Sequence, residues 1–202
     1  MRSRMIIGLC ALAIAFNSTA QEARTNPPVW ELTLQKEPIR TIKPVFRAHL
    51  KSDKQEFVFF VPQEVSVIND AGTIKFRNAE GNCVMTLSVL GPAPEAGDLN
   101  TQSFQERLMA EHDNKAIVIS SFSRAAAGRM GPGFDLEWEL QKRIIVCQRT
   151  VYIPSHVGVL EFRATATRPS FPGVQACLDS VIATFREVKD GNLDKMHVSP
   201  NS

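Results

Sequence analysis

Apolar and polar residues alternate along several short segments of this chain, and a period of two predicts β-strands. Turn-forming residues such as Asn69-Asp70-Ala71-Gly72 separate these segments. The alternation is clearest over 134–140, where four apolar residues alternate with three carboxylates. The predicted strands are Val29–Leu34, Glu56–Val61, Val65–Ile68, Thr73–Phe76, Cys83–Leu90, Ala116–Ser123 and Phe134–Leu140.

The strand over 134–140 is expected to form a hairpin with the apolar segment that follows it. A two-residue turn at Gln141-Lys142 places Leu136 opposite Cys147 and Trp138 opposite Ile145. In this register the tryptophan lies in the core, and the three carboxylates between the apolar residues face solvent.

A second hairpin is expected immediately afterwards. A four-residue loop over Ile153–His156 places Cys147 opposite Phe162 and Arg149 opposite Leu160. Both hairpins then share one apolar face.

Two segments instead show helical spacing. Ser103 and Glu106 form a capping-box pattern that predicts a helix to about Asn114. The last helix is expected from about Pro172, a residue favoured in a first turn, to Glu187. Its apolar stripe is suited to cover the hairpins and consists of Val174, Leu178, Val181, Ile182 and Phe185.

These elements predict an α+β fold. We expect an α/β sandwich with a central antiparallel sheet, one mid-chain helix and a C-terminal helix packed on it. The domain organisation is a single domain over residues 29–187, preceded by a polar leader at 21–28 and followed by a disordered tail at 188–202.

The first twenty residues have the pattern of a secretory signal peptide. Arg2 and Arg4 precede an apolar run over Met5–Phe16, which is too short to span a bilayer. Small residues follow, and we expect cleavage after Ala20. The sequence therefore predicts a soluble periplasmic or secreted protein without a transmembrane segment.

Charge narrows the class of partner. The chain has 23 basic and 21 acidic residues among 202, and cleavage of the signal peptide removes two arginines and no acid. A mature chain of zero formal charge lacks the positive field that nucleic acids select, so no nucleic-acid partner is expected.

Three cysteines remain after cleavage, in a compartment where disulfides form. Cys147 and Cys177 are a candidate pair, because Cys177 lies beside the apolar stripe of the last helix; Cys83 is an equally apolar alternative. The cysteines are also interpretable as small buried apolar residues. The four histidines are scattered singly, so neither a metal site nor a cofactor is expected.

The second half of the chain resembles the PsbP-like family. The similarity is greatest over the strand Val157–Ala166, the turn Arg168-Pro169-Ser170-Phe171-Pro172 and the helix end Leu178–Arg186. This family includes extrinsic photosystem II subunits and small bacterial envelope proteins. Over about residues 55–187, the resemblance implies an α/β sandwich that docks on a partner and has no transferable catalytic residues.

Two charged features are candidate sites. The carboxylates Asp135, Glu137 and Glu139 could gather a cation, or they could be a solvated strand face. The basic segment 36–54 is the second candidate. It could contact an acidic partner or an anionic surface, or it could be a solvated connector with a short helix over Pro44–Lys51. The residues of this weak interaction patch are Arg40, Lys43, Arg47 and Lys51.

No catalytic motif accompanies these features. Ser155-His156 has no nucleophile-elbow context, and the glycines around 128–133 lack the lysine of a phosphate-binding loop. We therefore expect a non-enzymatic accessory or protein-binding domain of the cell envelope, with another envelope or exported protein as its partner. The alternatives are a small exported hydrolase that uses an unpaired cysteine, and an inhibitor or immunity-type protein.

Overall fold

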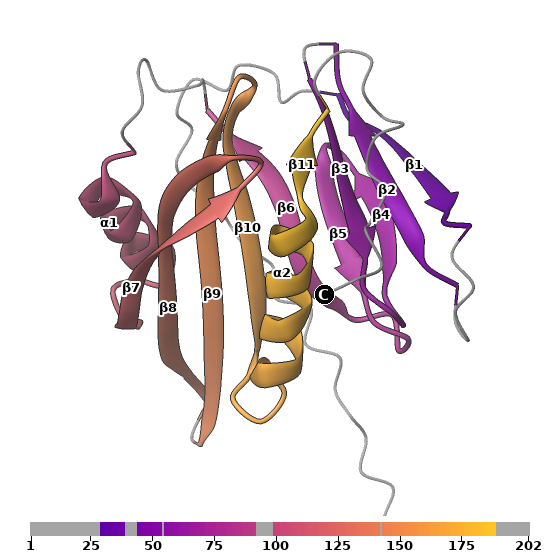
Figure 1. The fold of residues 1–202 in the computed structure, drawn as a ribbon. Coiled ribbons are helices and arrows are strands. Elements are labelled where there is room, and N and C mark those ends of the chain that lie inside the picture. The colour runs from indigo at the N-terminus through magenta and orange to yellow at the C-terminus, as the bar shows by residue number, and fades with distance from the viewer. Residues whose placement is uncertain (1–28, 39–43, 54, 92–98, 142, 189–202) are drawn as a thin grey trace, which may run out of the picture.

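The computed structural model describes residues 29–38, 44–53, 55–91, 99–141 and 143–188 (Figure 1). The predicted signal peptide, the leader and Arg40 and Lys43 of the basic segment lie outside the described residues. Val188, which the sequence assigns to the tail, is described, and its backbone N–H donates to the carbonyl of Glu56 at 2.9 Å.

The strands form two antiparallel sheets. The smaller sheet has the order β1-β2-β3-β11, and the larger has the order β4-β5-β6-β10-β9-β8-β7. The strands of the smaller sheet are β1 (Glu31–Lys36), β2 (Phe46–Lys51), β3 (Glu56–Val61) and β11 (Arg186–Glu187). Those of the larger sheet are β4 (Ser66–Asp70), β5 (Thr73–Arg77), β6 (Cys83–Leu90), β7 (Ile117–Ala126), β8 (Arg129–Gln141), β9 (Ile144–Ser155) and β10 (Gly158–Thr167).

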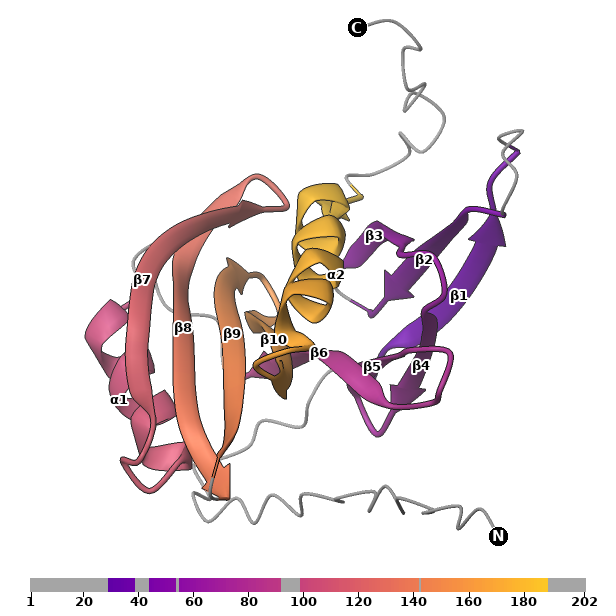
Figure 2. The same ribbon diagram turned by 90° about the horizontal axis from the view of Figure 1, so that it is seen from below.

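Two helices pack on this framework. The C-terminal helix α2 (Phe171–Thr184) contacts β10 of the larger sheet and β3 of the smaller one, and Figure 2 shows it between the two. The mid-chain helix α1 (Thr101–Glu111) lies at the β7 end of the larger sheet in both views. The predicted fold class is confirmed. No described helix is long and apolar enough to cross a membrane.

The main core lies between the two sheets and α2. Phe185, at the end of α2, is fully buried and contacts aromatic rings from both sheets. Its ring centroid lies 4.8 Å from that of Phe57 and 5.0 Å from that of Phe162. A second, smaller core lies under α1, where Leu108 packs with Phe134 and other residues of the larger sheet.

The predicted register of the first hairpin is wrong by one residue. Glu137, not Leu136, lies opposite Cys147, and Val146 lies opposite Trp138. Gln141, which the prediction places in the turn, is the last residue of β8, β9 begins at Ile144, and the register shifts again between Glu139 and Gln141. Because side chains alternate between the two faces of a sheet, a slip of one residue moves each side chain of β8 to the opposite face from the one predicted. The carboxylates therefore face α2, and the apolar residues of β8 face α1.

The second hairpin is tighter than predicted. Only two residues separate Ser155 from Gly158, so Cys147 lies opposite Ala166 rather than Phe162. Arg149 accordingly lies opposite Ala164 rather than Leu160. The Ser155 hydroxyl donates to the carbonyl of Gly158 at 2.7 Å and closes the turn. Gly158 has φ +137°, and a Cβ there would lie 2.4 Å from the carbonyl oxygen of Gly91, so glycine is required.

The helix ends also differ from the predictions. Helix α1 is capped by Asn100, whose side chain accepts from the N–H groups of Gln102 and Ser103, and α1 ends at Glu111. Helix α2 ends at Thr184 because Arg186–Glu187 pairs with β3.

Residues 46–51 form the strand β2 instead of the predicted helix over Pro44–Lys51. The alternation of buried Ala48 and Leu50 with polar residues decides this, since the strand buries one face between β1 and β3.

Phe185→Ala should be the more damaging of two aromatic truncations. It removes a fully buried ring at the centre of the main core, and we expect a loss of about 3–5 kcal/mol of unfolding free energy. Trp138→Ala removes a partly buried ring beside α1, and we expect a loss of about 1–2 kcal/mol. Urea unfolding of both variants provides the comparison, and equal losses would contradict the exchanged faces of β8.

Candidate functional site

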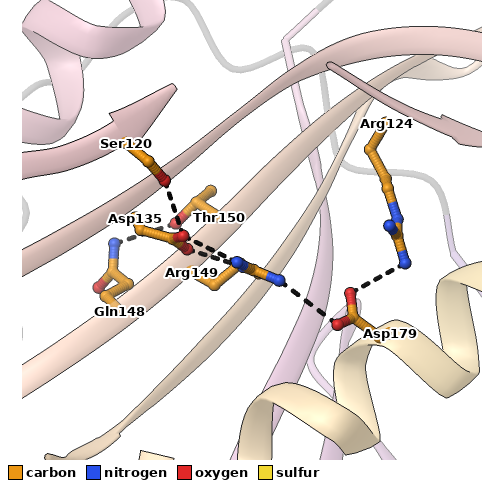
Figure 3. Close-up of polar contacts among 7 residues, drawn as sticks. All are labelled: Ser120, Arg124, Asp135, Gln148, Arg149, Thr150 and Asp179. Carbon is orange, nitrogen blue, oxygen red and sulfur yellow. Dashed lines mark hydrogen bonds and ion pairs between the residues drawn. The ribbon is translucent and has the colours of Figure 1, made fainter. Parts of the chain in front are cut away.

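An ionic network ties the last three strands of the larger sheet to α2 (Figure 3). Arg149 on β9 donates to both oxygens of Asp135 on β8, each at 2.7 Å. It also donates to Asp179 on α2 at 3.3 Å. Arg124 on β7 reaches the other oxygen of Asp179 at 3.1 Å, so one helical carboxylate joins two strands.

The network follows from the register of β8 and β9. Asp135 lies directly opposite Arg149, and Ser120 of β7 lies opposite Asp135 and donates to it at 2.8 Å. The side chains of Asp135 and Arg149 are only 19% and 16% exposed. Asp135 holds the pKa of Arg149 above its ordinary value through this bidentate hydrogen bond. With both oxygens bonded, Asp135 is an anchor rather than a free base or a cation ligand.

The ring of Phe122 adds to this anchor. The Arg149 guanidinium lies 4.8 Å from its centroid, a cation–π contact. Gly133 lies opposite Phe122, and a Cβ at that glycine would come within 2.3 Å of the ring. Glycine at position 133 therefore leaves room for the Phe122 ring, which contacts the Arg149 guanidinium.

The candidate cation-binding carboxylates Asp135, Glu137 and Glu139 form an acidic strip along β8, and the other two also accept hydrogen bonds. Glu137 is hydrogen-bonded to Arg168, which holds the pKa of Glu137 below its ordinary value. Glu139 accepts from the backbone N–H of Arg143 at 3.0 Å. Within the described ranges, no group of three or more histidine, cysteine or acidic side chains is placed to hold a metal ion. The strip faces arginines, and its first member is part of the anchor.

The three cysteines of the described residues are free thiols, so the candidate Cys147–Cys177 disulfide is absent from this structure. Cys147 is buried and its sulfur donates to Glu137 at 3.3 Å. Burial and Glu137 raise the pKa of Cys147, and burial raises the pKa of Cys177 to about 11. Such thiols carry little thiolate at neutral pH.

The basic patch is only partly described. Arg47 and Lys51 lie on the same face of β2, with His49 between them on that face. Arg47 forms an ion pair with Glu37 at 3.0 Å and lies 5.3 Å from the centroid of the Phe60 ring. Its charge is therefore matched locally.

A polar cluster under α1 has no counterpart in the sequence predictions. Arg163 on β10 pairs with Glu111 of α1 at 2.8 Å and with Glu161 at 3.0 Å. Tyr152 is fully buried, its hydroxyl has no hydrogen-bond partner among the described residues, and burial raises its pKa. The hydroxyl therefore keeps its proton. The sequence signal was the pair of charged residues Glu161 and Arg163 within the otherwise apolar run Val159–Ala164.

The strand β7 forms one edge of the larger sheet and carries exposed apolar side chains. It is the last strand of its sheet and pairs only with β8 among the described elements. Ile117 and Ile119 are 66% and 57% exposed, although both are large and apolar. Leu140 and Ile144, at the near end of the β8–β9 hairpin, are also exposed. The sequence predicts this strand but not its position at an edge.

A shallow groove of about 360 Å³ accompanies this edge. It lies between the edge strand β7, its neighbour β8 and the start of α1. The described lining residues are Leu99, Thr101, Ser121, Phe122, Ser123, Met130, Gly131 and Pro132, and none of them is charged.

Comparison with known proteins supports the fold. No family model and no curated protein sequence matches the chain. Among solved structures, CyanoP, a cyanobacterial PsbP from Synechocystis, has a TM-score of 0.50 at 14% identity, covering 74% of this chain and 95% of its own. The chain therefore has the PsbP-like fold.

Two further structures show weaker similarity. PA94, a protein of unknown function from Pseudomonas aeruginosa, has a TM-score of 0.37 at 12% identity, with coverage of 72% and 91%. LpqN, involved in cell envelope biogenesis of Mycobacterium tuberculosis, has a TM-score of 0.35 at 12% identity, with coverage of 83% and 87%.

Asp135→Asn should destabilise the protein although it removes only a charge. The amide cannot accept both arginine bonds, and hydrogen bonds to charged groups contribute about 1.5–3 kcal/mol. Glu139→Gln, on the same face but exposed, is the matched control and should change the unfolding free energy by less than about 0.5 kcal/mol. Chemical unfolding measures the unfolding free energy of both variants. Equal losses would contradict a stabilising role of the pair of Asp135 and Arg149.

His112 should make stability depend on pH. Its ring stacks on Trp138 at a centroid distance of 4.1 Å, and burial holds its pKa below the ordinary value of 6.5. Below about pH 6.5 the unfolded chain binds the proton more readily, so stability present at higher pH is lost as pH falls. His112→Phe keeps the stacking and should reduce this loss by up to about 1 kcal/mol between pH 7.5 and 5.5.

Urea unfolding at both pH values measures this difference, with the other histidines common to both proteins. Identical pH dependence in the wild type and the variant would contradict a lowered pKa for the half-buried His112.

Proposed function

We propose that this chain is an exported, non-enzymatic accessory module that binds another protein of the cell envelope. The observation that carries the proposal is the edge strand β7. Its outer backbone groups have no strand partner among the described elements, and they lie beside the exposed side chains of Ile117 and Ile119. Long apolar edges of this kind pair with other chains unless they are blunted, and exposed apolar residues grouped at an edge are typical of interaction sites.

Export is supported by the sequence of residues 1–20, with two arginines ahead of an apolar run and small residues at the cleavage position. The PsbP-like resemblance implies a domain that docks on a partner, and CyanoP is itself a PsbP protein. The basic residues of segment 36–54 remain a weaker candidate for a contact with an anionic surface.

The chemistry of the described residues favours binding over catalysis. The Ser155 side chain is buried, and its hydroxyl donates a hydrogen bond to the carbonyl of Gly158, while the neighbouring His156 is exposed. The thiols of Cys83, Cys147 and Cys177 all have pKa values raised by burial, which disfavours the nucleophile required by a cysteine hydrolase.

The proposal is tested in the native envelope. The full chain with a C-terminal tag is expressed in its own host, cross-linked and purified, and the mature protein is weighed by mass spectrometry. We expect a chain that begins at Gln21 and one cross-linked partner protein in reproducible stoichiometry. An uncleaved intracellular chain would contradict export, and a partner-free chain that turns over an envelope substrate would contradict an accessory role.

Thiol labelling distinguishes the accessory module from a hydrolase that uses an unpaired cysteine. Iodoacetamide at neutral pH should modify Cys147 and Cys177 slowly in the folded protein and rapidly after denaturation, because burial suppresses the thiolate. Rapid labelling of either residue in the folded protein would favour the hydrolase. An inhibitor or immunity-type role would appear as a cross-linked partner that is an enzyme with lost activity.

A further inference from the structure

The outer side of β7 has the geometry of an acceptor for one more strand. Residues Ser120–Ala126 pair in unbroken register with Asp135–Arg129, whereas the register shifts between Val118 and Ser120. The segment beyond this bulge therefore offers seven residues of regular edge, of which only Arg124 is charged. Arg124 lies on the α2 face, where it pairs with Asp179, so no charged side chain of 120–126 lies on the face that carries α1.

The groove lies beside this regular segment. Ser121 and Ser123 line it from β7, and they lie opposite Phe134 and Pro132, on the face that carries α1. Leu99 and Thr101, at the start of α1, line the other side. A strand added to β7 would direct alternate side chains to this face, next to the groove.

We propose that an extended segment of a partner protein adds to β7 along Ser120–Ala126 as an eighth strand and places its groove-facing side chains against α1. This inference rests on the proposed function and names its site. Backbone hydrogen bonds to the edge provide affinity, and the groove provides selectivity, as in other modes of β-strand addition.

The groove selects the chemistry of the segment. Its described lining combines the apolar side chains of Leu99 and Met130 with the hydroxyls of Thr101, Ser121 and Ser123. A charged side chain would lose hydration there without finding a described counter-charge. The segment therefore carries uncharged residues at alternate positions, of the size of valine, leucine, methionine or threonine.

The leader of this chain is too short to be the occupant. The residues before β1 approach the opposite edge of the sheet, since the carbonyl of Trp30 accepts from Asn69 of β4. Six interstrand spacings of about 4.8 Å separate β4 from β7. The eight leader residues 21–28 extend at most about 29 Å, which leaves nothing to lie along β7.

A second copy also fits poorly. In a β7–β7 pairing, the side chains directed to the groove face would be Ser121, Ser123 and Ala125 of the added strand. These are too small to fill a groove of about 360 Å³. A partner segment with larger apolar side chains fills it better.

The test uses a display library of ten-residue peptides, selected on chain 21–202. We expect enriched peptides that alternate uncharged apolar residues and bind with dissociation constants in the micromolar range. Hydrogen exchange of the complex should slow at amides within 120–126. Ser123→Lys places a charge in the groove beside the edge and should weaken the selected peptide at least tenfold.

Ser66→Lys is the matched control, because Ser66 is an exposed serine on β4, the other edge of the same sheet. It should bind the peptide as the wild type does. Melting temperatures of both variants verify that they fold.

Three results would overturn the proposal: no selected peptide that protects 120–126, equal binding by Ser123→Lys, or protection in the free chain of the β7 amides that point away from β8. In the last case, loss of protection on dilution would identify a second copy, and loss on removing 189–202 would identify the tail. If Ser123→Lys still captures the envelope partner, the accessory function stands and the edge is wrong. If neither the wild type nor Ser123→Lys captures an envelope partner, the proposed accessory function is wrong.

Discussion

Asp135 on β8 and Arg149 on β9 form a bidentate ion pair across the two strands. It fixes which face of β8 is polar, and it directs the arginine toward α2, where Asp179 also holds Arg124 of β7. Two strands are thereby tied to one helix by partly buried charges that would be costly to leave unpaired. The apolar residues of β8 are left to form the smaller core under α1.

This arrangement separates a fixed inner face from an open outer edge. The helix α2 and its charges hold β7 from inside, and the main core around Phe185 holds α2 against both sheets. The backbone edge of β7 and the groove beside α1 remain available because nothing in the described part of the chain pairs with them. A rigid strand offered in this way loses little conformational freedom on binding, which favours an interaction module.

Local patterns predicted the elements well, since alternation and helical spacing depend on neighbouring residues. The strands Glu56–Val61 and Cys83–Leu90 have the predicted bounds. The registers failed because single features set them: the irregularity next to Gln141 and the tight turn at Gly158. The candidate edge was not predictable, because the order of strands in a sheet is a long-range property. Of the predicted patch, only Arg47 and Lys51 are described, on β2 rather than on a helix.

Cross-strand contacts between backbone protons, measured by NMR in solution, determine the register of β8 against β9. The register of the structure predicts nuclear Overhauser contacts that join Asp135 with Arg149 and Glu137 with Cys147. Contacts joining Leu136 with Cys147 would contradict it. In that register the carboxylates would face away from α2, and the anchor that presents β7 would not exist.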